Sequence, residues 1–237
     1  NDFNEVGDLV PQMQALTAVN PNAVTIPVTR TNGITTALVA PKGGRFPGTA
    51  AVIDLHGYTP EQMDAGFKGV VMNFPSSGRR GRWDRRSDED IKKDSEKALK
   101  KLDEIWADAV LYAKIDSAAN SQKTQITGYQ PEMEALKSVI NKKTLLLVEV
   151  NKSSDILLAI DWIKKTGVKA VLTGVAEGYR VASKIAEAGL AVITGPVLDT
   201  PRREYDKYDA PYTNAAVMFK AGIKVAIRTD EAENVRN

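Results

Sequence analysis

Hydrophobic and polar residues in the second half of the chain follow a repeating pattern of short apolar runs and longer amphipathic segments. Residues 144–150 form an apolar run too short for a helix, and 153–165 carry apolar side chains at helical spacing. Three further strands are predicted directly after glycines that end helices, at Gly167, Gly189 and Gly222. Strands that alternate with helices predict a parallel sheet, because parallel neighbours need a crossover connection.

The first half of the chain is less regular. Apolar runs predict a strand over 34–40 and two more over 49–55 and 67–74. The last two are separated by a turn-rich segment, so they could form a hairpin at the side of the main sheet. Seven strands are therefore expected in all, one fewer than an eight-stranded barrel contains.

Residues 75–117 predict an insertion that consists of a basic loop and a long polar helix. A capping box at Ser87 and Asp90 marks the start of the helix. Charged residues are so dense that only one narrow stripe can be buried. The expected stripe comprises Ile91, Ala98, Leu102, Ile105, Trp106 and Val110. We expect residues 1–237 to form a single domain, a partial barrel that carries this insertion.

Composition narrows the classes of function. The 237 residues match the size of one α/β barrel, about 250 residues. A net charge of +2 does not suggest a nucleic-acid binder, and no apolar run reaches the roughly 18 residues of a membrane helix. The chain contains no cysteine, which excludes disulfides, thiolate zinc sites and cysteine nucleophiles. We therefore expect a small-molecule substrate as partner, and neither nucleic acid nor a membrane.

Candidate functional residues follow the predicted strands. Loops at the carboxyl ends of barrel strands form one rim, where reactive groups gather. Glu149 and Asp230 lie at such ends, and two carboxylates there could hold a metal or exchange a proton. The alternative is that Glu149 is exposed or pairs with a lysine, and that Asp230 caps a turn. Asn151, Gly174 and Glu177 also follow strands and are expected to contact substrate.

Two other features carry candidate chemistry. His56 is the only histidine, so it cannot build a multi-histidine zinc site, and we interpret it as polar surface. Five arginines with Trp83 in segment 78–86 could bind an anion or nucleic acid. Acidic residues follow immediately, which favours a solvated loop paired with its own helix.

Five stretches of the sequence carry a family pattern when they are taken together. They are NEVGDLVPQMQALTAVNPN, IPVTRTNGITTALVAPKGGRFPGTAAVIDLHGYTPEQM, ALKSVINKKTLLLVEVNKSSDI, VLTGVAEGYRVASKIAEAGLAVITGPV and PYTNAAVMFKAGIKVAIRTDEAENVRN. These stretches resemble the imidazolonepropionase-like branch of the amidohydrolase superfamily, which is found among bacterial exported proteins. They cover most of the chain except the basic loop and the long helix, and they stand in the order of the family.

The resemblance implies a distorted (β/α)8 barrel, a TIM-barrel-like metal-dependent hydrolase fold that is incomplete in this chain. In that family one or two divalent metals, with zinc expected here, activate water for hydrolysis of an amide or cyclic C–N bond. Asp230 falls on the last-strand aspartate, which binds metal and accepts the water's proton, so it is the implied catalytic residue. Asp230 and Glu149 are the implied metal ligands. Glu149 or Asn151 falls near the histidine ligand of the fifth strand, and Gly174 falls near that of the sixth.

This chain also departs from the family. The His-x-His strand is expected upstream of Asn1 and the closing segment after Asn237, and the fifth and sixth strands lack their histidines. We expect the intact parent to be the metal-dependent hydrolase; for this chain alone, the absence of any cofactor stays open as an alternative. The resemblance implies export to a bacterial periplasm, with the cytoplasm as the alternative.

Three further expectations stay open. The barrel could be a catalytically inactive relative that binds a small molecule or serves as a scaffold. The chain could instead form an open doubly wound sheet, in which the strand order would reverse. A barrel that lacks a strand leaves sheet edges open, so we expect a homo-oligomer.

Overall fold

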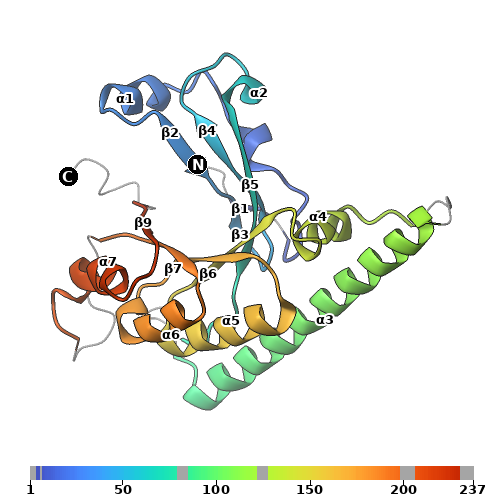
Figure 1. Cartoon of the computed structure of the whole chain (residues 1–237), viewed down its shortest axis with the longest axis vertical. Coiled ribbons are helices and arrows are strands. Elements are labelled where there is room, and N and C mark those ends of the chain that lie inside the picture. Colours follow the sequence, from blue (N-terminus) through green and yellow to red (C-terminus); the bar gives the residue numbers. More distant parts are fainter. Residues whose placement is uncertain (1–3, 6, 79–84, 122–127, 198–205, 230–237) are drawn as a thin grey trace. The chain divides into compact units, whose positions relative to one another are not determined.

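The computed structural model describes residues 4–5, 7–78, 85–121, 128–197 and 206–229 (Figure 1). The chain divides into two compact units. The first unit is Asn1–Asn73 with Trp106–Leu146, and the second is Phe74–Ile105 with Leu147–Asn237. Most elements belong to one unit, whereas α3 (Asp88–Ser121) and β6 (Leu145–Val150) contribute residues to both.

The first unit contains the antiparallel strands. Its elements are β1 (Asn4–Glu5), η1 (Ala15–Ala18), α1 (Thr25–Thr31), β2 (Thr36–Val39), β3 (Lys42–Gly43), β4 (Gly48–Asp54), α2 (Pro60–Met63), β5 (Asp64–Asn73) and α4 (Pro131–Ile140). β2 pairs antiparallel with β4, and β4 pairs antiparallel with β5. The strands predicted over 34–40, 49–55 and 67–74 are therefore confirmed.

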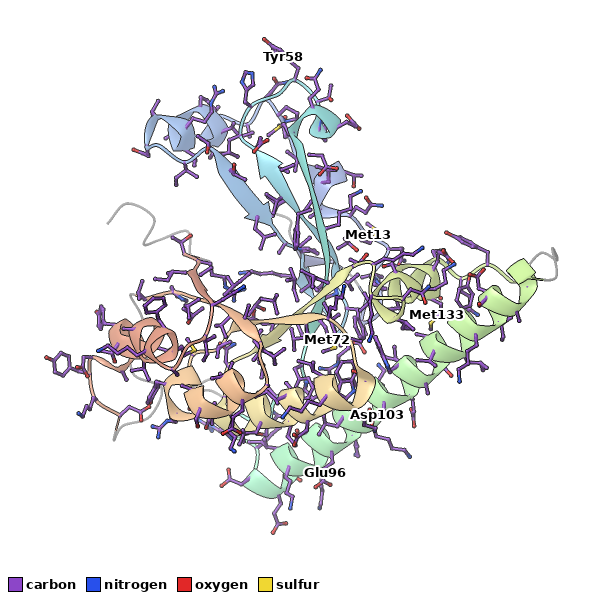
Figure 2. The ribbon with its side chains drawn as sticks, viewed as in Figure 1. Met13, Tyr58, Met72, Glu96, Asp103 and Met133 are labelled. Carbon is purple, nitrogen blue, oxygen red and sulfur yellow. The ribbon has the colours of Figure 1, made fainter. Side chains whose placement is uncertain are left out.

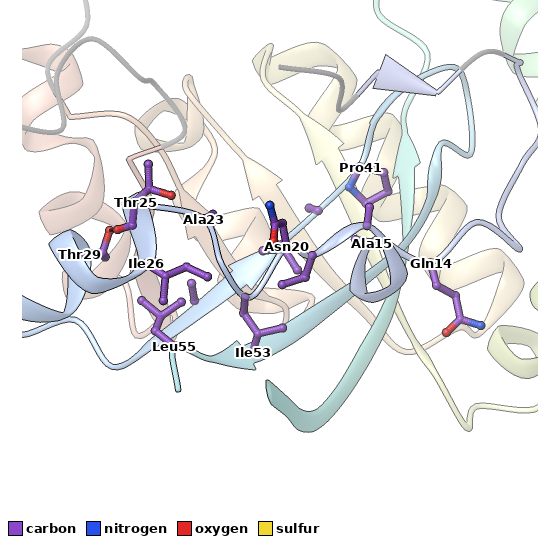
Figure 3. A pocket seen from close by; sticks show the side chains of 15 residues that line it. Gln14, Ala15, Asn20, Ala23, Thr25, Ile26, Thr29, Pro41, Ile53 and Leu55 are labelled. Atoms are coloured by element: carbon purple, nitrogen blue, oxygen red, sulfur yellow. Dashed lines mark hydrogen bonds between the residues drawn. The ribbon is translucent and has the colours of Figure 1, made fainter. Parts of the chain in front are cut away.

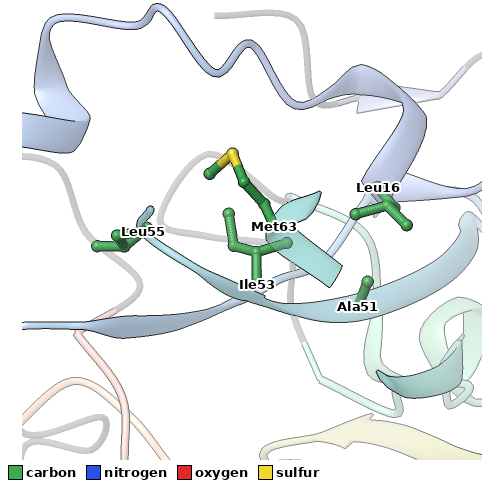
Figure 4. Packing of buried hydrophobic residues seen from close by; sticks show 5 residues of the cluster. All are labelled: Leu16, Ala51, Ile53, Leu55 and Met63. Carbon is green, nitrogen blue, oxygen red and sulfur yellow. The ribbon is translucent and has the colours of Figure 1, made fainter. Parts of the chain in front are cut away.

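The core of the first unit forms on one face of β4. Ala51 and Ile53 point to the same face because successive side chains of a strand alternate, and Leu55 continues this face after the strand. Leu16 from η1 and Met63 from α2 cover it, and none of the five side chains is more than 8% exposed. Figure 4 shows Met63 beside Ile53. Burial of apolar surface thus holds η1 and α2 to the strand.

The second unit contains the parallel strands. Its elements are β6 (Leu145–Val150, which begins in the first unit), α5 (Ser153–Thr166), β7 (Ala170–Gly174), η2 (Gly178–Arg180), α6 (Ala182–Glu187), β8 (Ala191–Thr194), α7 (Ala210–Lys220) and β9 (Val225–Ile227). β7 pairs parallel with β8, and β8 pairs parallel with β9. Helices stand between these strands in the sequence, so the predicted alternation is confirmed.

The sheet has seven strands in the order β2-β4-β5-β6-β7-β8-β9. The predicted hairpin exists as β4 and β5, but its predicted place at the side of the main sheet is wrong, because both strands lie within this order. Their burial gives the reason, since Val70, Val71 and Met72 are all buried and need cover on both faces. The order contains no reversal, which favours a barrel-like α/β chain over an open doubly wound sheet.

The predicted polar helix is α3 (Asp88–Ser121), which runs through both units. Ser87 Oγ accepts a hydrogen bond from Asp90 N at 3.1 Å, which confirms the predicted cap. Of the predicted stripe, Ile91, Leu102 and Trp106 are buried, whereas Ala98, Ile105 and Val110 are half-buried. Among helices in the described part of the chain, none combines the length and apolar character that a membrane crossing needs.

Helix α5 packs against α3 within the second unit. Trp162 Nε1 donates a hydrogen bond to Asp103 Oδ1 at 3.1 Å, and Figure 2 marks Asp103 on α3. Ile156, Ile160 and Ile163 form the buried face of α5. The helix ends at Gly167, whose φ of 69° is the left-handed conformation predicted for a terminating glycine.

Replacement of Met63 with alanine tests the core of the first unit. Met63 is fully buried, so Met63→Ala should lower the free energy of unfolding by about 2–5 kcal/mol through lost burial and a residual cavity. Met13→Ala is the matched control, because Met13 is 44% exposed, and its effect should stay within about 0.5 kcal/mol. Urea denaturation measures both values. Equal losses for the two variants would contradict this packing.

Candidate functional site

The carboxyl ends of β6, β7, β8 and β9 meet in the second unit. Three backbone hydrogen bonds join residues at these ends: Val175 N to Val150 O (2.8 Å), Gly195 N to Gly174 O (3.4 Å) and Arg228 N to Thr194 O (2.8 Å). The residues that follow the four strands are therefore neighbours, as expected for one rim of a parallel sheet.

Glu149 and Arg228 form an ion pair at this rim, which we call the strand-end ion pair. Arg228 Nη2 donates to Glu149 Oε1 at 3.0 Å and to Oε2 at 2.8 Å. Thr173 Oγ1 donates to Oε2 at 2.7 Å, and Asn151 Nδ2 donates to Oε1 at 3.1 Å. The side chains of Glu149 and Arg228 are 26% and 27% exposed. Both carboxylate oxygens of Glu149 are thus bonded within the protein, and its cationic partner is an arginine instead of a lysine.

Two glycines make room for the strand-end ion pair. A Cβ at Gly174 would stand 2.6 Å from Asn151 Oδ1 and closer still to Glu149 Oε1, and the φ of +80° also disfavours a side chain. A Cβ at Gly195 would stand 2.6 Å from Arg228 Cγ. The ends of β7 and β8 therefore have no side chains where the pair lies. Gly174 was predicted to contact substrate. In the structure, the side chains of Glu149 and Asn151 occupy the space beside it.

Glu177, also predicted to contact substrate, follows β7, and its carboxylate reaches the N-terminus of α5. Its carboxylate is 4% exposed, and Oε2 accepts hydrogen bonds from Ser153 N at 2.9 Å and from Ser153 Oγ at 2.8 Å. A negative charge at a helix N-terminus is stabilised by the unpaired N–H groups and the helix dipole. This geometry favours a structural role for Glu177, whereas Asn151 lies directly beside Glu149.

Asp230 lies outside the described residues, so its predicted catalytic and metal-binding roles stay predictions. Within the described ranges, no group of three or more His, Cys, Asp or Glu residues is placed to hold a metal ion. A divalent cation at Glu149 would also meet the guanidinium of Arg228. Repulsion amounts to about 4 kcal/mol per pair of unit charges 4 Å apart near a protein surface. The described residues therefore do not fit a divalent metal at Glu149.

Arg228 and Asn214 are site residues that the sequence patterns did not reveal. Arg228 stands directly after β9, where its long side chain reaches Glu149. Asn214 is a polar residue on the buried side of α7 and is 3% exposed. Its Nδ2 donates to Val175 O at 2.9 Å and its Oδ1 accepts from Tyr179 N at 2.8 Å. In the sequence, Asn214 stands four residues after Ala210 and four before Met218, so it lies on the apolar face of the helix. A polar residue at such a position is the signal that could have revealed it.

The turn after β7 is held in a rare conformation. Val175 has a φ of +50°, which is costly for a β-branched residue. Its N–H donates to Val150 O, and its carbonyl accepts from Asn214. Strained residues of this kind persist only where surrounding contacts fix them, and they concentrate at functional sites.

Tyr179 of η2 has a phenol that stays protonated at neutral pH. Burial raises the pKa of Tyr179 above its ordinary value, and the opposing effect of Arg180 does not cancel this rise. The Arg180 guanidinium lies 5.0 Å from the ring centroid and also pairs with Asp206. Tyr179 therefore carries a hydroxyl hydrogen that it can donate.

A second polar cluster joins residues 76–78 to the start of α5. Asp155 is 1% exposed and accepts hydrogen bonds from Ser77 N at 3.0 Å and from Ser154 Oγ at 3.1 Å, and Ser77 Oγ bonds to it as well. Lys152 Nζ donates to Ser77 Oγ at 3.3 Å. Asp155 thus accepts hydrogen bonds from both the backbone N–H and the hydroxyl of Ser77, which anchors this segment to the start of α5.

The first unit contains a cavity of about 400 Å³ (Figure 3). Ile26, Val39 and Ile53 are among its apolar walls, and Gln14 and Asn20 are among its polar ones. The volume suits a small molecule. None of its lining residues is titratable, so the cavity offers binding surface without a group for acid–base chemistry.

A neighbouring cavity of about 430 Å³ includes His56 and Arg30 among its lining residues. Arg30 Nη1 lies 3.2 Å from His56 Nδ1, so Nδ1 acts as an acceptor and neutral His56 carries its proton on Nε2. His56 is exposed, which agrees with its interpretation as polar surface. The arginines at 79, 80 and 82 and Trp83 lie outside the described residues, while Arg86 pairs with Asp94 at 2.7 Å.

Replacement of Gly174 with alanine tests the crowding at the rim. Gly174→Ala should destabilise the fold more than Gly189→Ala, because both have positive φ but only Gly174 has neighbours within 4 Å of the added Cβ. Gly189→Ala should cost about 1–2 kcal/mol from backbone strain alone. The free energy of unfolding, measured in urea, compares the two. A Gly174→Ala loss no larger than that of Gly189→Ala would show that the pair is not confined by this glycine.

No protein-family model and no curated protein matches the sequence. Among solved structures, an amidohydrolase from Thermotoga maritima MSB8 is similar, with a TM-score of 0.80 and 21% sequence identity. The match covers 98% of this chain and 60% of that chain, so this chain spans less than two thirds of the neighbour's length. At this level of identity the likeness shows the fold. The chain therefore has the α/β fold of a large part of an amidohydrolase.

Proposed function

We propose that the protein acts on a small molecule at the carboxyl ends of β6 to β9, and that the whole protein hydrolyses an amide or cyclic C–N bond. The observation that carries the proposal is the convergence on Glu149 of Thr173 from β7, Asn151 directly after β6 and Arg228 directly after β9. The fold shared with an amidohydrolase supports the reaction class. The imidazolonepropionase-like branch, and export to a bacterial periplasm, are finer parts of this proposal that rest on the sequence resemblance.

Roles at the rim follow from residue chemistry. We propose that Asp230 accepts the proton of the attacking water as the water oxygen bonds to the carbonyl carbon, and that this proton passes to the leaving nitrogen when the C–N bond breaks. Asn151 follows β6, and the N–H of its Nδ2 that does not bond Glu149 is proposed to bind substrate. The resemblance suggests zinc in the whole protein, but the described residues do not fit a metal at Glu149, so no step is assigned to one.

A second candidate function is a catalytically inactive relative that binds a small molecule or serves as a scaffold. The geometry of Glu149 favours it, because both carboxylate oxygens are taken up by Arg228, Thr173 and Asn151. A carboxylate held in this way stabilises the rim through its bonds to three side chains.

Hydrolysis by the whole protein distinguishes the two candidates. Wild type should release amine from a panel of simple N-acyl amino acids and cyclic amides, tested with and without added zinc. Asp230→Asn should lower kcat by about 100-fold or more, since a positioned base typically contributes 10²–10⁴-fold. Asp161→Asn is the matched control: Asp161 is exposed on α5, so its replacement should leave the rate unchanged. An unchanged rate in Asp230→Asn would discard its role. If wild type turns over none of these compounds but one of them raises its melting temperature in a thermal-shift assay, the result would support the catalytically inactive relative.

We also propose self-association through the β9 end of the sheet. Among the strands that the structure describes, β9 stands last in the order and pairs with β8, while Ile227 on β9 and Phe219 on α7 are 59% and 71% exposed. Exposed apolar side chains on an edge strand favour pairing with another chain. Ile227→Lys should therefore shift an oligomer toward the monomer in light scattering at micromolar concentration, whereas Leu158→Lys on α5 should not. A wild-type monomer would contradict this proposal.

A further inference from the structure

We infer that Arg228 supplies, at the carboxyl ends of β6 to β9, the positive charge that balances Glu149, so that Glu149 is the partner of a guanidinium and not a ligand of a divalent metal. The fold is shared with an amidohydrolase, and the sequence resemblance predicted a metal at Glu149. The geometry at the rim points to a different source of positive charge. The inference holds for either candidate function.

The first argument is the number of donors around one carboxylate. Arg228 Nη2 lies within 3.0 Å of both oxygens of Glu149, and Thr173 and Asn151 donate one hydrogen bond to each oxygen. A divalent ligand set leaves carboxylate lone pairs directed at the ion. Here the lone pairs accept N–H and O–H groups from three sides, which is the environment of a carboxylate in a charge-assisted hydrogen-bond network.

The second argument is independent of these bonds and concerns the space around the pair. A Cβ at Gly174 would overlap Glu149 and Asn151, and a Cβ at Gly195 would overlap Arg228. β7 therefore ends in a glycine and a glycine directly follows β8, at the two places where the pair lies. The rim is shaped to hold the extended arginine, which would not be needed for a compact ion.

The pair also explains the positions of its neighbours. Asn151 donates to Glu149 through Nδ2, which turns its Oδ1 toward Ala176 N at 3.4 Å. Thr173 is buried and directs its hydroxyl to the same carboxylate. Arg228 is thus a positioning residue, which orients the groups at the rim through Glu149.

Zinc binding tests the inference. Calorimetric titration with zinc chloride alone compares the chelator-treated whole protein with Arg228→Met, Glu149→Gln and the double variant. Wild type and Glu149→Gln should give the same isotherm, because Glu149 does not bind the ion. Arg228→Met removes the competing charge and should bind zinc at least about tenfold more tightly than wild type. The double variant should lose this gain.

Two outcomes would overturn the inference. Weaker zinc binding by Glu149→Gln than by wild type would make Glu149 a metal ligand, and no gain in Arg228→Met would mean that Arg228 does not exclude the ion. Circular dichroism checks that each variant is folded. If Arg228→Met does not fold, the comparison of wild type with Glu149→Gln still decides the question. Catalytic activity does not enter the readout, so failure of the proposed hydrolysis leaves this test intact.

Discussion

The ion pair between Glu149 and Arg228 is the interaction on which the described strand ends depend. Charged groups that are only about a quarter exposed destabilise a fold unless they are matched. The pair reaches from the end of β6 to the end of β9, and so it passes over the ends of β7 and β8. The path of the pair requires glycine at positions 174 and 195, because a side chain at either position would take the space of the pair.

The turn after β7 belongs to the same rim and is fixed by contacts with α5 and α7. Val175 keeps its strained φ of +50° because Asn214 from α7 bonds its carbonyl group. Glu177, a little further along, fixes the turn to the first residue of α5, Ser153. Two helices thus determine the conformation of one short segment. A rim that is fixed in this way is pre-organised, which is the property a binding or catalytic site needs.

A shared fold leaves the chemistry open, because function depends on the side chains that a fold presents. The similarity to an amidohydrolase concerns the course of strands and helices. At the ends of those strands, the described residues present a guanidinium bonded to a carboxylate. The positive charge beside Glu149 is therefore that of a protein side chain.

The local elements and the candidate rim were predictable from the order of residues along the chain. The apolar run over 144–150 became β6 and Gly167 ended α5, because strand burial and helix termination depend on a few neighbouring residues. The same pattern placed Glu149 at a strand end. Its partner was not predictable in this way, since Arg228 lies 79 residues further along the chain and meets Glu149 only in the folded protein. The tertiary structure likewise joined Asn214 to the strained turn, 39 residues away. Such pairs form when strands and helices are brought side by side, and spacing along the chain does not specify which side chains then meet.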